Sequence, residues 1–156
     1  MKTIHWLYAI TMLLFVTSVG LVIVSARAAQ RSAAFVTPIA STKEIMNGMI
    51  EPASTAVFNA VSTSITAKGA EEVAPKNDQE WQAVTDKAAM LVESANLLMI
   101  GSRIRDKGEW IRQSQAFMDA SKVALDAAPA RRADALFAAG EAIDKSCDNC
   151  HAKYQK

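Results

Sequence analysis

The sequence predicts an all-α protein, folded as an antiparallel up-down-up-down four-helix bundle. Its composition favours helix, because alanine, leucine and methionine are plentiful while the 156 residues include only 6 glycines and 4 prolines. Along several segments apolar residues recur at alternating spacings of three and four, the pattern of a helix with one buried face. No alternating run of β-branched and aromatic residues is long enough to predict a strand. Short links between such helices favour antiparallel neighbours.

The most regular helix is predicted to begin near residue 78. Asn77 or Asp78 can cap it, and Glu80 completes a capping box from Asn77. Gly101 marks its end, since glycine is the usual residue just beyond a helix. Its predicted buried face comprises Trp81, Val84, Ala88, Leu91, Ala95 and Leu98.

Two further helices are predicted towards the C-terminus. Asp106 and Glu109 have the spacing of a capping box before the first of them, and Pro129 suits the first turn of the second. The first has a buried face of Trp110, Phe117 and Ala124 beside Ile111, Met118 and Leu125. The second has a buried face of Ala133, Leu136, Gly140, Ile143, Cys147, Cys150 and Tyr154, so both cysteines are expected to point into the core.

The earliest helix of the bundle is predicted over residues 42–65, followed by a polar connection over residues 67–76. Pro52 lies inside this helix and leaves the carbonyl of Gly48 without its usual partner, so we expect a kink. The alternative is that the helix begins at Pro52 and residues 41–49 form a separate turn. Its expected buried face comprises Met46, Ile50, Ala53, Val57 and Val61.

Residues 1–28 are predicted to be a signal peptide, and residues 29–156 the exported domain. Lys2 and His5 precede an apolar run over residues 6–24, and Ala26 and Ala28 provide the small residues of a cleavage site. The run is long for a signal peptide and approaches the roughly 20 residues that span a bilayer. The alternative is therefore an uncleaved membrane anchor through residues 6–24.

The charge and the residue types disfavour several functions. A formal net charge of +1 gives no reason to expect a nucleic-acid partner. Catalysis by a Ser-His-Asp triad needs a free histidine, and the sequence offers no glycine-rich loop that would cradle phosphate. We therefore expect no catalytic residues and no enzyme.

The sequence Cys-Asp-Asn-Cys-His at residues 147–151 contains both cysteines of the chain. Cys-x-x-Cys-His is the attachment signature of a c-type haem, in which the two sulfurs form thioethers and the imidazole ligates the iron. A structural zinc site needs four ligands, and the other histidine, His5, lies in the targeting segment. A redox dithiol expects a strand before the motif, and a disulfide across two residues would close a very small loop. The motif therefore predicts one covalent haem c near the C-terminus of the fourth helix, on Cys147, Cys150 and His151.

Up-and-down topology predicts which other residues lie near this haem. The start of the first helix, the end of the second and the start of the third share the haem end of the bundle. Met46, Met49 and Met99 are then at the level of the haem and can supply a second axial ligand. Met90 and Met118 lie roughly 12 Å or more along their helices from that end and are interpreted as core residues.

An exported four-helix chain that ends in Ser-Cys-Asp-Asn-Cys-His-Ala-Lys-Tyr resembles the class II c-type cytochromes, the cytochrome c′ family. This family is itself a standard example of the up-down bundle. The resemblance runs from about Ser41 onwards and is closest to the low-spin, methionine-ligated members. It places Met46 over the iron and Met49 in the pocket wall. Thr42 stands where the family has an arginine that contacts a haem propionate, and Lys43, Arg103 and Arg105 are the candidates to replace that arginine.

The resemblance implies a periplasmic carrier of single electrons that meets redox partner proteins, and many relatives form homodimers. The first alternative is a five-coordinate cytochrome c′ that binds nitric oxide or carbon monoxide, with no protein ligand on the second face. Met99 is a further candidate for the axial position. A third class is an interaction module that is held at a membrane by an uncleaved first helix and whose haem is structural.

Overall fold

The computed structural model describes residues 5–6, 8, 11–18, 37–67 and 69–155, and the chain divides into two units, residues 1–37 and 38–156. In the first unit residues 11–18 are helical, and the large apolar side chains there, such as Phe15, are exposed. The predicted cleavage site at Ala28 lies outside the described residues. Among those that are described, no helix combines the length and the apolar character needed to cross a membrane.

The first helix of the second unit begins where the sequence predicts. α2 (Thr42–Ile45), the π-helical turn η1 (Met46–Ile50) and α3 (Glu51–Ala60) follow one another without a break. Ser41 caps this helix: its hydroxyl accepts the Glu44 N–H, and the Glu44 carboxylate accepts the Ser41 N–H at 2.7 Å. The Ser41 hydroxyl also donates to the Glu44 carboxylate at 2.7 Å, and this bond, together with that from the Ser41 N–H, lowers the pKa of Glu44. The alternative in which the helix begins at Pro52 is therefore wrong.

The irregularity expected at Pro52 takes the form of the π-helical turn that precedes it. Proline has no N–H to offer the carbonyl four residues earlier, and its ring crowds that carbonyl. The wider turn over Met46–Ile50 accommodates this, and the Glu51 N–H donates to the carbonyl of Met46, five residues back. Single π turns inside α-helices are frequent at functional sites, and this one begins at a predicted iron ligand.

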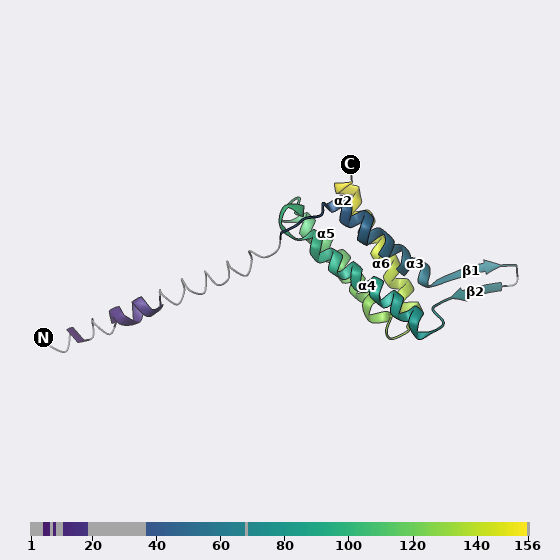
Figure 1. Ribbon diagram of the computed structural model, residues 1–156, viewed down its shortest axis with the longest axis horizontal. Coiled ribbons are helices and arrows are strands. Elements are labelled where there is room, and N and C mark those ends of the chain that lie inside the picture. The colour runs from purple at the N-terminus through teal and green to yellow at the C-terminus, as the bar shows by residue number, and fades with distance from the viewer. Residues whose placement is uncertain (1–4, 7, 9–10, 19–36, 68, 156) are drawn as a thin grey trace. The chain divides into compact units, whose positions relative to one another are not determined.

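The prediction of helix up to residue 65 and of an irregular polar link over residues 67–76 is wrong. The helix ends at Ala60, and β1 (Ser62–Thr66) pairs with β2 (Gly69–Val73) in an antiparallel hairpin that extends from the helical part of this unit (Figure 1). β-branched and hydroxyl residues in β1 have low helix propensity and fit an extended strand. Every residue of both strands is exposed, so no buried alternation marked them in the sequence.

The later helices follow the predicted order. α4 (Asp78–Leu98) starts after Asn77, whose side chain accepts the Glu80 N–H at 2.9 Å. The short helix η2 (Gly101–Arg103), α5 (Glu109–Ala127) and α6 (Ala133–Tyr154) complete the chain. Pro129 lies in the turn before α6 and not in its first turn, because the chain reverses through Arg131 at φ 54°.

The helices bury most residues of the faces that the sequence predicts, but Cys147 and Cys150, expected in the core, are half-buried. α5 packs against α4 and α6, and α3 packs against the same two helices (Figure 1). The largest fully buried apolar side chains are Ile45, Val57, Leu91, Leu136 and Ile143. The second unit is thus mostly helical, as predicted, with the hairpin as its one departure among the described residues.

A buried arginine joins the start of the first helix to the end of α4. Arg103 is 7% exposed, and its guanidinium donates from Nε to the carbonyl of Ala40 at 2.9 Å and from Nη1 to that of Leu97 at 3.0 Å. Gly101 beside it has φ 57°, and a Cβ there would lie 3.0 Å from Cγ of Pro38. The segment before α2 and the end of α4 are therefore held together through the Arg103 side chain.

Replacing Arg103 by alanine is expected to lower the free energy of unfolding by about 1–3 kcal/mol, because two carbonyls lose their partner. Arg105→Ala, at an exposed position nearby, serves as the control and is expected to change it by less than about 0.5 kcal/mol. Urea unfolding of the purified protein measures both. Equal effects of the two substitutions would show that the Arg103 bridge does not stabilise the fold.

Candidate haem site

The described structure has a hollow at the end of α6, and both cysteines line it. Side chains from η1, α4, α5 and α6 converge there, which are the segments that the predicted topology brings to one level. The lining residues are Met46, Ile50, Leu98, Gln113, Ser114, Phe117, Ser146, Cys147, Cys150 and His151.

α6 positions the three residues of the motif. Cys150 and His151 follow Cys147 by three and four positions, so both lie on the face of the helix that carries Cys147, and all three residues are half-buried. Burial, with the negative charge of Asp144, raises the pKa of Cys147 to about 11. Burial also raises the pKa of Cys150. Both shifts favour the neutral thiol over the thiolate at neutral pH.

Met46 is the predicted axial methionine that lines the hollow. Met49 packs against the core but is not a lining residue, and Ile50 lines the hollow in its place. Met46 and Ile50 are four residues apart, so they share the helix face that the sequence predicts to be buried. Met99 follows α4 and is not a lining residue, whereas its neighbour Leu98 is.

None of the predicted propionate partners lines the hollow. Lys43 and Arg105 are exposed, and Arg103 gives two of its donor nitrogens to main-chain carbonyls. Lys43 lies in α2, directly before η1, and Arg105 follows η2, which comes after α4. Both η1 and the end of α4 contribute lining residues. Contact of Lys43 or Arg105 with a propionate remains a prediction.

Sequence reasoning missed three buried polar residues of the lining: Gln113, Ser114 and Ser146. Gln113 and Ser114 are buried in α5, and Nε2 of Gln113 donates to the Glu109 carboxylate at 2.7 Å. They follow Trp110 by three and four residues, so the helical period already placed them on its buried face. A polar pair on an otherwise apolar face was the signal that could have identified them.

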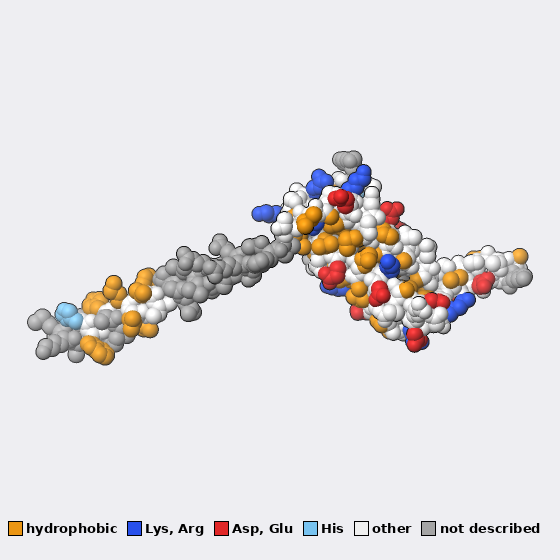
Figure 2. All heavy atoms as spheres, viewed as in Figure 1, with side chains coloured by type: hydrophobic (Ala, Val, Ile, Leu, Met, Phe, Trp, Pro, Cys, Tyr) orange, Lys and Arg blue, Asp and Glu red, His pale blue; other side chains and the backbone are white. Residues whose placement is uncertain are grey.

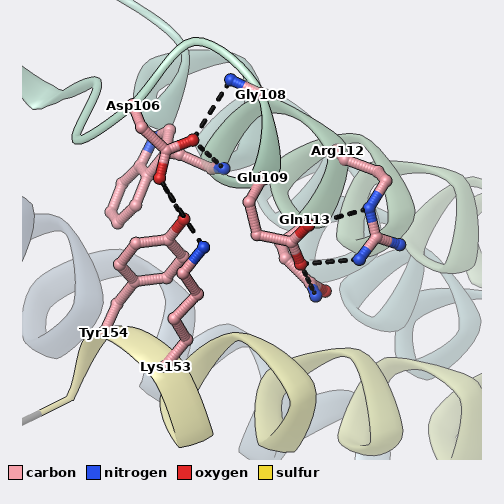
Figure 3. Close-up of polar contacts among 8 residues, drawn as sticks. Asp106, Gly108, Glu109, Arg112, Gln113, Lys153 and Tyr154 are labelled. Carbon is pink, nitrogen blue, oxygen red and sulfur yellow. Dashed lines mark hydrogen bonds and ion pairs between the residues drawn. The ribbon is translucent and has the colours of Figure 1, made fainter.

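A hydrogen-bonded clasp fixes the last turn of α6 beside the hollow (Figure 3). The Tyr154 hydroxyl donates to Oδ2 of Asp106 at 2.5 Å, and the Tyr154 ring meets the Trp110 ring edge-on with centroids 4.9 Å apart. Nζ of Lys153 lies 3.9 Å from the same carboxylate oxygen. The indole N–H of Trp110 donates in turn to the carbonyl of Leu98 at 2.8 Å. The clasp thereby links the ends of α4 and α6 with the start of α5.

The predicted capping box of Asp106 and Glu109 before α5 is wrong, because Gly108 is the N-cap residue and has no side-chain cap. The second carboxylate oxygen of Asp106 accepts the N–H groups of Gly108 and Trp110 at 3.1 and 3.0 Å. The Glu109 side chain turns along the helix to bind Arg112 at 2.6 Å, and it does not reach back (Figure 3). The nearby guanidinium is a stronger partner for a carboxylate than a main-chain N–H.

The clasp needs an ionised Asp106 and a protonated Tyr154. The hydrogen bond from Tyr154 and the Trp110 N–H lower the pKa of Asp106 below its usual 3.8. Burial and the bond to Asp106 raise the pKa of Tyr154 from 10.0 to about 12. The stabilisation from Asp106 is present above pH 3.8 and lost as pH falls through its lowered pKa. That from Tyr154 is present below pH 10.0 and lost as pH rises towards 12.

Asp106→Asn is therefore expected to lower the free energy of unfolding most between pH 3.8 and pH 10.0, where Asp106 is ionised and Tyr154 is protonated. The difference in free energy of unfolding from the unmutated protein should narrow below pH 3.8 and again between pH 10.0 and about 12. Urea unfolding over a pH series measures it. Asp119→Asn removes an exposed α5 carboxylate that lies 3.6 Å from Lys122 and serves as the control. A constant difference for Asp106→Asn across the whole range would contradict the clasp.

The donor set of the hollow fits a covalent haem c: two thiols for the thioethers, an imidazole and a thioether for the iron. The volume of the hollow is about 40 Å³, much less than a porphyrin occupies, so a haem held by these residues would extend beyond the hollow. No cluster of three or more His, Cys, Asp or Glu among the described residues could hold a metal ion by itself. Comparisons with protein-family models, with curated proteins and with solved structures give no match to this chain.

Proposed function

We propose that this chain is a c-type cytochrome that carries single electrons. The observation that supports the proposal best is that Cys147, Cys150, His151 and Met46 line one hollow, although Met46 comes from a segment remote in sequence. In this proposal α2 to α3, α4, α5 and α6 are the four helices of an antiparallel bundle, and one haem c is attached near the end of the last. The bound haem supplies an iron that exchanges one electron.

The side chains of the hollow have separate roles in this proposal. His151 and Met46 hold the iron from two different segments, and a thioether ligand favours the ferrous state and raises the potential. Ile50, Leu98 and Phe117 keep water from the site, which disfavours the net positive ferric form. The clasp at Tyr154 restrains the helical turn that carries His151. The geometry of a site held in this way would change little between the oxidised and reduced states. A carrier that exchanges electrons with redox partner proteins requires such a site.

We propose further that the protein is exported and works in the periplasm. The described residues of the first unit include a helical stretch over residues 11–18 with exposed apolar side chains, which suits a signal peptide or a membrane anchor. N-terminal sequencing of the exported protein separates the two. A chain that begins at Ala29 supports cleavage, and one that still begins at Met1 supports the anchor.

A five-coordinate gas-binding cytochrome is the second candidate. The apolar lining of the hollow favours it, because Ile50, Leu98 and Phe117 would provide a water-poor pocket for nitric oxide or carbon monoxide if Met46 did not bind the iron. The two candidates differ in the occupancy of the second axial position.

Optical spectra of the purified protein test the choice between them. The carrier predicts low-spin spectra in both oxidation states, a far-red band from methionine bound to ferric iron, and slow uptake of carbon monoxide by the ferrous form. Rapid uptake of carbon monoxide by the unmutated ferrous protein would contradict the carrier and favour the gas-binding candidate.

A further inference from the structure

The hairpin of β1 and β2 is an unsupported two-stranded ribbon. All ten residues of its two strands are exposed, and Ile65 is 88% exposed. In Figure 2 the ribbon projects with few charged atoms on its visible face. A two-stranded hairpin with no buried face is marginally stable by itself, and three or more strands are needed for independent stability. The ribbon would therefore gain from another strand.

The two edges of the ribbon differ in charge. β1 consists of Ser, Thr and Ile residues and has neither a charge nor a proline, the features that usually protect a free edge from pairing. β2 carries Glu71 and Glu72 near its centre. Two β2 strands brought together would set these carboxylates close to one another, whereas two β1 strands bring no charges together. The composition thus favours β1, and not β2, as the strand that pairs with the same strand of a second chain.

We propose that β1 pairs antiparallel with β1 of a second copy of this chain, about a two-fold axis at Ser64. The result is a four-stranded sheet in the order β2, β1, β1, β2, in which the same edge of each copy forms the contact. Thr63 of each chain then lies opposite Ile65 of the second copy, and both are β-branched residues that favour paired strands. Each β1 thereby gains a second ladder of main-chain hydrogen bonds.

The proposed contact leaves the hollow free. The hairpin joins the end of α3 to the start of α4, while Leu98 of the hollow lies at the other end of α4. The 21 residues of α4 separate these ends by about 30 Å. A dimer formed through β1 would therefore keep both hollows available to other proteins, and it does not depend on the proposed haem function.

Sedimentation equilibrium of the full exported protein, with any haem retained, tests the dimer over a range of concentrations. The test variant is Ser64→Lys. Ser64 is paired with Glu71 across the hairpin, so the new lysine forms an opposite-charge pair within the ribbon and keeps it intact. At the two-fold axis the lysines of the two copies face each other. The dissociation constant of the dimer is expected to rise at least tenfold.

A charge-swapped variant makes the test specific. The double variant Ser64→Glu with Glu71→Lys keeps an opposite-charge pair in the ribbon and is also expected to be monomeric. Mixing it with Ser64→Lys should restore a dimer that contains one chain of each kind. Gln115→Lys, at an exposed position of α5, is the matched control and should dimerise normally.

The outcomes are distinct. An unmutated protein that is monomeric at all concentrations would overturn the proposal, and so would a dimer that Ser64→Lys leaves unchanged, since the contact would then lie on another face. Failure of the mixed pair to associate would overturn the two-fold register. The absorption spectrum should be the same in all variants, so these results are independent of the proposed electron-carrier function.

Discussion

Replacing Met46 by alanine is expected to abolish the far-red band of the ferric protein and to make the ferrous protein bind carbon monoxide rapidly. Met46 is the methionine that lines the hollow with the motif, and alanine has no atom that could reach the iron. The reduction potential is expected to fall by part of the roughly 0.8 V range over which axial ligands set it. Optical spectra and a redox titration of the purified variant measure these changes.

Met49→Ala is the matched control, because Met49 lies on the same turn and packs against the core without lining the hollow. This substitution is expected to lower the free energy of unfolding by no more than about 5 kcal/mol and to leave the spectra unchanged. Loss of the far-red band in Met49→Ala, with its retention in Met46→Ala, would transfer the axial role to Met49 and contradict the assignment.

Replacing both Cys147 and Cys150 by serine is expected to remove covalent haem completely. The two thiols are half-buried on one face of α6, and a serine hydroxyl cannot form the thioether bond. Haem staining of the protein after denaturing electrophoresis measures attachment. Either single substitution should leave one thioether and reduce the yield of stained protein.

Ser146→Ala is the control for this experiment. Ser146 also lines the hollow, and its hydroxyl donates to the carbonyl of Ile143 at 2.7 Å within α6. Stained protein should persist in this variant. Staining that survives in the double cysteine variant would show that haem is held without these sulfurs.

The helices were predictable because their burial is periodic. In α4 the spacing of apolar residues and the Asn77 cap fixed both the face and the start of the helix. The first helix was predicted with the correct start at Thr42 but too long, because β1 has no buried face and therefore no alternation to reveal it. Such a hairpin is apparent from propensity alone, which is a weaker signal than periodicity.

The candidate site was predictable where the residues are adjacent in sequence, and less so where the fold brings them together. Cys147, Cys150 and His151 follow from their spacing, and the predicted topology indicated that Met46 would lie near them, as it does in the lining of the hollow. Ile50 was predicted on the same buried face as Met46, whereas the family resemblance assigned the pocket wall to Met49, which does not line the hollow.

The contacts that brace the site are long-range. Tyr154 and Asp106 are 48 residues apart, and Arg103 and Ala40 are 63 apart. Neither pair has a sequence signature, because a tyrosine or an arginine near a helix end has many partners within reach. The predicted role of Arg103 at a propionate rested on its position after α4, and nothing in the sequence indicated that main-chain carbonyls engage its guanidinium.

The mass of the exported protein under denaturing conditions, measured together with its visible spectrum, tests the central claim most directly. The account predicts a coloured protein whose mass exceeds that of its polypeptide by one haem, with the excess on the peptide that contains Cys147 and Cys150. A colourless protein with the mass of the bare polypeptide would contradict it.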